Sequence, residues 1–282
     1  MHSVEKANVT TSIQQSGFLR FETPEAVAHR ALFLQRQRLD QLNPVGRELL
    51  QSVMGADGTI GPTALNDLRK VMFYRGCTDD VRLFMWTLCL GYYNETTTQA
   101  ERLALDTQRE AEYERVKSTW QNVLPEMKAN WAEFQKTEEQ IRKDVDRTDR
   151  EDAAFWADPR NAETLSNVLM SAFMYNVDLG YGQGMNDIAV VVMRLTQNEA
   201  QAFWLFQAIM AQLEGFYSSK PNVITDLLNR IDIIVSSVAP ALSEYLRRRG
   251  INYLFFYKNI VLLYKRFFET RDILRFWDVC SV

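Results

Sequence analysis

The sequence predicts an all-α protein, and three observations support this fold class. Apolar residues recur at helical spacing, as on the shared face of Leu83, Trp86 and Leu90. A proline follows a capping residue at Thr23-Pro24 and at Asp158-Pro159, which is typical of the first turn of a helix. No stretch is dominated by alternating apolar and polar residues between turn signals, so β-strands are not expected.

Residues 1–70 are predicted to contain a flexible start and two helices. Residues 1–21 are polar and unpatterned, which indicates a flexible lead-in, and residues 22–70 are predicted to form an N-terminal helical extension. The first helix begins at Thr23-Pro24 and ends before Asn43-Pro44. Asn43 is then expected to cap a second helix that ends at Gly55.

Residues 71–282 are predicted to form the larger helical domain. Thr78, followed by two aspartates, opens a helix that Gly91 closes. The charged region 96–140 is predicted to be a long, solvent-exposed helical stretch that Pro125 interrupts. More apolar helices are expected after Gly184, over residues 188–195, 200–216, 223–238 and 241–249.

Composition argues against several classes of function. The chain has 282 residues, of which 46% are hydrophobic and 24% charged, as is ordinary for a soluble globular protein. A net charge of −4 argues against a nucleic-acid partner, which requires a basic face. With two histidines and no cysteine cluster, no metal site is expected, and Cys77, Cys89 and Cys280 are predicted to be free thiols. Neither a signal peptide nor a transmembrane run is apparent, so we predict a cytoplasmic protein.

The stretch from Ile141 to Thr148 contains the first candidate site. Asp144 and Arg147 are three residues apart, which places them on one helix face, where they can form a salt bridge. Considered alone, this pair is interpreted as part of a solvated charge cluster, because Asp146–Arg150 and Arg147–Glu151 are also within pairing distance. Arginine donates hydrogen bonds and carries charge but does not titrate, so it suits electrostatic stabilisation better than acid–base chemistry.

The second candidate stretch runs from Tyr181 to Asp187 and places Gln183 between Gly182 and Gly184. Considered alone, it fits a plain turn between helices. A glutamine amide can both donate and accept hydrogen bonds, so it can orient another molecule. The flanking glycines allow close approach of a partner to the backbone. No phosphate-binding loop is present, because no strand precedes the glycines and no Gly-Lys-Ser/Thr follows them.

Together these motifs resemble the signature of the TBC domain, the family of GTPase-activating proteins for Rab-type small GTPases. The matching residues are Ile141-x-x-Asp144-x-x-Arg147-Thr148 and Tyr181-x-Gln183-Gly184-Met185-Asn186-Asp187. An upstream block, Arg75-Gly76 followed by Arg82-x-x-x-Trp86, matches in order and spacing. The sequence departs from the family pattern at Cys77-Thr78 and at Tyr257-Lys258-Asn259, where the family often has Phe-Arg-Trp.

The resemblance implies a role for each matching residue. Arg147 would be an arginine finger held in place by Asp144, and Gln183 would be a glutamine finger that orients the attacking water. Tyr181 and Thr148 would support these two residues. Four further residues are expected to bind the partner or to be structural: Arg82, Trp86, Asn186 and Asp187. The family domain continues beyond the helical pattern of residues 271–279, so we expect a TBC-type domain of two subdomains that is incomplete at its C-terminal end.

The implied function is activation of a GTP-loaded Rab-type GTPase in trans, so the chain itself would not be an enzyme. No cofactor is expected, since the partner GTPase would hold the GTP and the Mg²⁺ ion. We expect peripheral recruitment to endomembranes and a role in vesicle trafficking. One alternative is a non-catalytic helical scaffold or effector that binds a Rab without activating it. A second alternative is a hydrolase using Asp144, Asp146 or Asp149, which would need an apolar pocket to raise one carboxyl pKa.

Overall fold

The computed structural model describes residues 42–218 and 222–280, and every regular element in these ranges is an α-helix. The helices in chain order are α3 Arg47–Val53, α4 Pro62–Arg75, α5 Asp79–Cys89, α6 Gln99–Gln121, α7 Pro125–Ala129, α8 Ala132–Arg147, α9 Ala153–Trp156, α10 Arg160–Tyr175, α11 Met185–Met193, α12 Glu199–Tyr217, α13 Val223–Val238, α14 Pro240–Arg248, α15 Leu254–Val261 and α16 Thr270–Cys280. The predicted all-α fold class is therefore confirmed. The lead-in over residues 1–21 and the helix beginning at Thr23-Pro24 lie outside the described residues.

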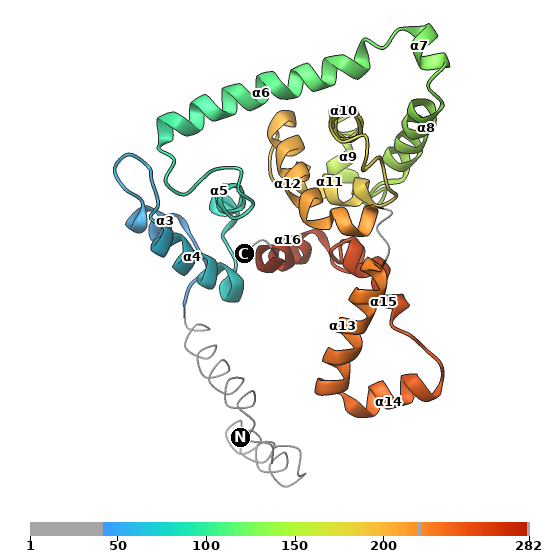
Figure 1. Cartoon of the computed structure of the whole chain (residues 1–282). Helices are drawn as coiled ribbons and strands as arrows, with labels where there is room; N and C mark the ends of the chain where they lie inside the picture. Colours follow the sequence, from blue (N-terminus) through green and yellow to red (C-terminus); the bar gives the residue numbers. More distant parts are fainter. Residues whose placement is uncertain (1–41, 219–221, 281–282) are drawn as a thin grey trace.

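Helix α11 forms the centre of the fold, and every one of its residues is buried. Helix α10 lies beside it and also contacts α6, α8 and α12 (Figure 1). The predicted interruption at Pro125 is confirmed, because α6 ends before it and the short helix α7 begins there. Helix α6 starts with a capping box in which Thr98 and Glu101 each bind the other's backbone amide.

Helix α16, near the end of the chain, packs against the helices of the N-terminal part of the structure. It packs against α4, and its Trp277 ring stacks on that of Trp86 with 5.9 Å between the ring centroids. Asp278 is fully buried. Its Oδ1 accepts a hydrogen bond of 2.8 Å from the indole of Trp86 and forms an ion pair of 3.2 Å with Arg82. Its other oxygen accepts from the amide of Cys77 at 3.1 Å. The carboxylate is fully partnered, as a buried charge requires.

The boundaries of two helices show where local signals succeed and where they fail. The helix predicted to open at Thr78 is confirmed, since α5 begins directly after it. Asn43 was expected to cap the helix that ends at Gly55, and this is wrong, because α3 begins at Arg47 with Gly46 as its N-cap. The backbone of Val45 instead bonds to Gly76 and Thr78, both at 2.9 Å, and this pairing holds the chain extended before α3.

Helices α13, α14 and α15 form a lobe that extends away from the α11 core (Figure 1, orange to red). Helix α13 packs mainly on α14, and none of its residues is buried. The apolar side chains of α13 are therefore thinly covered in the structure, and Ile233 is 66% exposed.

Within residues 42–218 and 222–280, no helix combines the length and apolar character needed to cross a bilayer.

Candidate functional site

Asp144 anchors the candidate site. It lies one turn before the end of α8, and it is fully buried. Arg147 pairs with its Oδ1 at 2.6 Å, and the amide of Gln140 donates to the same oxygen at 3.0 Å. The other oxygen, Oδ2, accepts a hydrogen bond of 2.8 Å from the hydroxyl of Tyr181. The three-residue spacing on one helix thus yields the predicted ion pair, and a donor from another segment completes it.

Arg147 is the last residue of α8, and its side chain remains 51% exposed although its partner Asp144 has no exposed surface. The contact of 2.6 Å joins one terminal nitrogen of the guanidinium to Oδ1 of Asp144. The guanidinium carries five N–H donors in all, so most of this donor set is available to a ligand. The buried carboxylate of Asp144 therefore holds the Arg147 guanidinium at the protein surface.

Tyr181 connects α8 to the loop that precedes α11. Burial raises the pKa of its phenol, and the hydrogen bond to Asp144 raises it further, so the hydroxyl stays protonated and donates. The contact joins residues 37 positions apart in the chain. Because Tyr181 lies two residues before Gln183, this bond ties the Gln183 loop to the end of α8 that carries Arg147.

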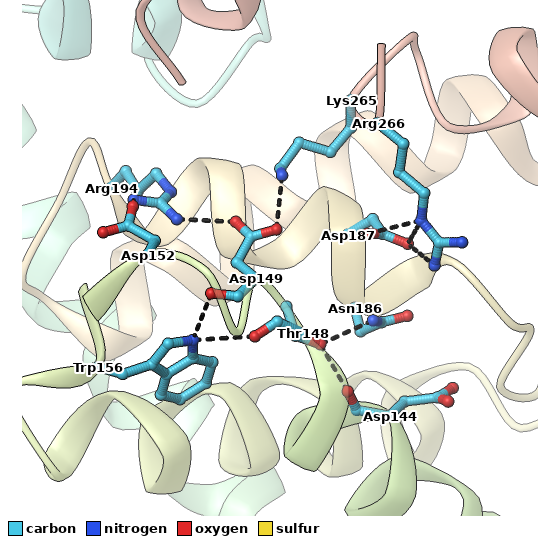
Figure 2. Close-up of polar contacts among 10 residues, drawn as sticks. All are labelled: Asp144, Thr148, Asp149, Asp152, Trp156, Asn186, Asp187, Arg194, Lys265 and Arg266. Carbon is cyan, nitrogen blue, oxygen red and sulfur yellow. Dashed lines mark hydrogen bonds and ion pairs between the residues drawn. The ribbon is translucent and has the colours of Figure 1, made fainter. Parts of the chain in front are cut away.

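Thr148 and Asn186 form a second link between the same two segments (Figure 2). The Thr148 hydroxyl donates to the backbone oxygen of Asp144 at 2.6 Å and accepts from the Asn186 amide at 2.8 Å. The Asn186 side-chain oxygen in turn accepts from the backbone amide of Gly184 at 3.2 Å. Both Thr148 and Asn186 are buried, so this link is shielded from solvent.

Gln183 is exposed, and among the described residues no hydrogen bond fixes its side chain. A Cβ atom at Gly182 would lie 2.5 Å from Tyr217 Cδ1, and one at Gly184 would lie 2.3 Å from Leu262 Cδ2. Gly184 also has a φ of +104°, which side-chain-bearing residues rarely adopt. The two glycines therefore let other parts of this chain pack against the loop, a reason that the sequence did not disclose.

The turn that follows Arg147 is held by residues that sequence analysis did not identify as a group. Asp149 has a φ of 43°, and its backbone oxygen accepts from the Trp156 indole at 3.0 Å. Its carboxylate pairs with Arg194 at 2.7 Å and with Lys265 at 2.8 Å. These cations come from 45 and 116 positions away in the chain, so no local pattern could have indicated them.

A pocket of about 460 Å³ opens beside this turn. Its lining residues are Arg147, Thr148, Asp149, Arg150, Glu151, Asn186, Asp187, Lys265, Arg266 and Phe268. Four of these side chains are cationic and three are carboxylates, so the lining carries a net charge of +1. Lys265 and Arg266 are paired with Asp149 and Asp187, which leaves Arg147 and Arg150 as the cations nearest to a ligand in the pocket. Gln183 is not among the lining residues, although its loop reaches the same end of α8 through Tyr181.

The remaining predicted residues fall into two places. Asp187 is buried in the first turn of α11 and forms a two-pronged ion pair with Arg266, the shortest contact being 2.7 Å. Arg82 and Trp86 lie apart from the pocket, where both bind the buried carboxylate of Asp278. Their contacts join α5 to α16, which is a structural role.

The site offers little to a carboxylate hydrolase. Both oxygens of Asp144 accept hydrogen bonds from fixed donors, and both oxygens of Asp149 are paired with cations. Asp146 is exposed on α8, where it lies 3.9 Å from Arg142. The arrangement favours positioning and charge stabilisation.

Comparison with known proteins places these features in a family. A family model described as the Rab-GTPase-TBC domain matches residues 79–282. Human TBC1 domain family member 17 is 29% identical over 247 residues, which cover 86% of this chain and 38% of that protein. The GTPase-activating protein GYP7 of Yarrowia lipolytica is 28% identical over 240 residues, covering 76% of this chain and 33% of that protein. The chain thus spans about a third of the length of these curated relatives.

Two solved structures share the fold. The crystal structure of the Ypt/Rab-GAP domain of Gyp1p aligns with a TM-score of 0.70 at 16% identity, covering 83% of this chain and 79% of that one. The flagellar RabGAP TBC domain of Chlamydomonas aligns with a TM-score of 0.58 at 16% identity, covering 90% of this chain and 72% of that one. The arrangement of helices in this chain is that of these TBC domains.

Proposed function

The chain belongs to the Rab-GTPase-TBC domain family, and on this premise we propose that it accelerates GTP hydrolysis by a Rab-type small GTPase. It inserts Arg147 and Gln183 into the active site of the GTP-loaded partner, which itself holds the nucleotide and Mg²⁺. The observation that carries this proposal is the bond between Tyr181 and Asp144, because it connects the two segments that present Arg147 and Gln183. In this proposal the chain and its Rab partner meet on the membrane that carries the Rab.

The guanidinium of Arg147 supplies the charge. Negative charge develops on phosphate oxygens during phosphoryl transfer, and a planar guanidinium matches their geometry better than an ammonium does. Such a finger contributes on the order of 10³–10⁵ in rate, or about 4–7 kcal/mol of barrier. Asp144 supports this function because its buried carboxylate holds Arg147 at the surface before the partner arrives.

The amide of Gln183 orients the attacking water. Its side chain is exposed and unbonded among the described residues, so it can reach a partner without breaking an internal contact. Packing of Tyr217 and Leu262 against Gly182 and Gly184 fixes the backbone on both sides of it. A flexible side chain on a fixed backbone suits a residue whose hydrogen bonds form only in the complex.

The proposal is tested by GTP turnover of a panel of Rab GTPases, with and without this chain. Arg147→Lys is expected to lose at least 100-fold in stimulated rate, because the ammonium lacks the fork. Gln183→Ala is expected to lose a similar factor while binding to a GTP-state mimic changes little, because the contact strengthens in the transition state. A Rab whose own catalytic glutamine is replaced should still respond to the unaltered chain.

Two matched controls come from exposed positions. Arg142→Lys is the control for Arg147→Lys, because Arg142 lies on the same helix. Gln121→Ala is the control for Gln183→Ala and changes the last residue of α6. Neither Arg142 nor Gln121 lines the pocket. Both are expected to activate normally. Binding without any acceleration would instead identify a non-catalytic Rab-binding scaffold, and near-normal activation by Arg147→Lys would remove Arg147 as the finger.

A further inference from the structure

Two consecutive residues, Lys265 and Arg266, bind the two halves of the site. The ammonium of Lys265 lies 2.8 Å from Asp149, in the turn that follows Arg147. The guanidinium of Arg266 contacts both oxygens of Asp187, at 3.2 and 2.7 Å, in the helix that follows the Gln183 loop. Figure 2 shows the two side chains diverging from neighbouring backbone positions toward these two carboxylates.

The segment that carries this pair is itself well fixed. Leu263 and Tyr264 both have positive φ angles, of 46° and 58°, which turn the chain sharply between α15 and α16. The backbone oxygen of Leu263 accepts a hydrogen bond of 2.8 Å from the buried indole of Trp277. Leu262 packs against Gly184 from the same segment. The turn is therefore a rigid support that reaches the site from the C-terminal part of the chain.

Burial gives both ion pairs a defined geometry. Each pair has one buried partner: Lys265 is 7% exposed and Asp187 is 4% exposed, whereas the side chain of Arg266 is 41% exposed. A buried ammonium or carboxylate is stable only with a well-placed counter-charge, so Lys265 and Asp187 each depend on the partner they contact. Asp149 lies two residues after Arg147, and Asp187 lies four residues after Gln183. Each ion pair therefore acts close to one proposed finger.

We propose that Lys265 and Arg266 are positioning residues that set the placement of Arg147 relative to Gln183. Lys265 acts through the Arg147 turn, and Arg266 acts through the start of α11. This inference rests on the proposed function. This positioning role differs from a purely structural one because Lys265 is assigned to Arg147 and Arg266 to Gln183. Substituting Lys265 or Arg266 should therefore have different effects in a variant that lacks Arg147 and in one that lacks Gln183.

The variant Lys265→Met tests the first assignment with little risk to the fold. Methionine fills a similar volume, and Asp149 keeps its ion pair with Arg194 at 2.7 Å. The matched control is Lys117→Met, because Lys117 forms a comparable partly buried pair with Glu199 at 2.7 Å, away from the pocket. Lys265→Arg, which retains a cation, is the conservative variant.

In GTP turnover assays on a responsive Rab, Lys265→Met is expected to lower the stimulated kcat about 10- to 100-fold, because a small misplacement of a catalytic group has effects of this size. The KM for the Rab should change less than twofold. Lys265→Arg should recover most of the rate, and Lys117→Met should retain it.

The decisive step repeats the substitution in variants that lack one finger. In an Arg147→Ala background, Lys265→Met should cause no further loss, whereas in a Gln183→Ala background it should cause its full loss. Arg266→Gln should show the opposite pattern. Equal losses in both backgrounds would show a general structural role and overturn the assignment.

Hydrogen exchange supplies a readout that does not depend on GTPase activation. Amides of residues 147–152 should exchange faster in Lys265→Met than in the unaltered chain, and they should not change in Lys117→Met. Unchanged exchange there would overturn the positioning role, even if activity fell. Failure of the unaltered chain to accelerate any Rab would contradict the proposed function instead, so the two failures are distinguishable.

Discussion

Helices α11 and α13 contain similar runs of branched aliphatic residues, Val190–Val192 and Ile233–Val235, but their burial is opposite. Every residue of α11 is buried, whereas no residue of α13 is, and Ile233 is 66% exposed. The difference comes from neighbours: α11 contacts α8, α10 and α12, while α13 packs mainly on α14. Apolar sequence alone therefore does not identify the core of this protein.

The comparison also explains where the candidate site lies. Arg147 ends a helix that packs on α10 and α11, and Gln183 precedes α11 by one glycine. Both are thus attached to the most deeply packed part of the chain. Local opening requires least free energy where few apolar contacts are lost, so the α13–α15 lobe should open before the site does. Substitutions in the two regions should separate accordingly.

The largest expected difference is in stability. Ile188→Ala removes a fully buried side chain from α11 and should lower the free energy of unfolding by about 2–5 kcal/mol. Ile233→Ala makes the same chemical change on the exposed face of α13, where surface substitutions change stability by about 0.5 kcal/mol or less. Urea denaturation of both variants measures the two values. Similar losses would mean that the lobe is covered in solution.

A smaller effect should distinguish two glycines. Gly182→Ala would place a methyl group against Tyr217 and should cost about 1–3 kcal/mol as overpacking, while shifting Gln183 and reducing GTPase activation. Gly250→Ala in the lobe meets no atom within 4 Å, although its φ of +65° adds about 1–2 kcal/mol of strain.

Thermal denaturation and GTP turnover together separate these two glycine effects. Both variants should lose stability, but only Gly182→Ala should lose activity. If Gly250→Ala reduced activation as strongly, the site would depend on the lobe, contrary to the expectation that the lobe opens before the site does.

The smallest expected effect concerns acid. Burial alone would raise the pKa of Glu199, but bonds from Lys117, Tyr113 and Asn167 lower it below its usual 4.5. A carboxyl with a lowered folded pKa stabilises the protein above its unfolded pKa and loses that contribution as pH falls through the folded value. Unfolding measured from pH 6 to pH 3 should therefore show a steeper loss for the unaltered chain than for Glu199→Gln.

One titrating group limits this slope difference to about 1.4 kcal/mol per pH unit. The lobe offers the control, because Glu244 pairs with Arg247 and Arg248 through side chains that are all largely exposed. Such surface pairs contribute about 0–1 kcal/mol, so Glu244→Gln should follow the profile of the unaltered chain closely. A flattened profile for Glu244→Gln would place a buried electrostatic contact in the lobe.

Local signals in the sequence predicted the fold class and several helix boundaries. Proline at residues 125 and 240 acts within one helical turn, so it marks the start of a helix without help from the rest of the chain. Thr78 occupies the N-cap position of α5, as predicted, although its side chain makes no capping hydrogen bond. The spacing of Asp144 and Arg147 predicted their ion pair for the same reason. The helix start expected at Asn43 failed because pairing of Val45 with distant backbone outweighed the local cap.

Only the tertiary structure decided which of these residues belong to one site. The contacts of Tyr181 with Asp144, Lys265 with Asp149 and Arg266 with Asp187 join positions 37, 116 and 79 apart. Tertiary packing likewise decided that α11 is buried and α13 is not. Such contacts form only when packing brings distant segments together and removes water from between them. Their free energy is therefore a property of the folded chain, and no short-range pattern in the sequence encodes it.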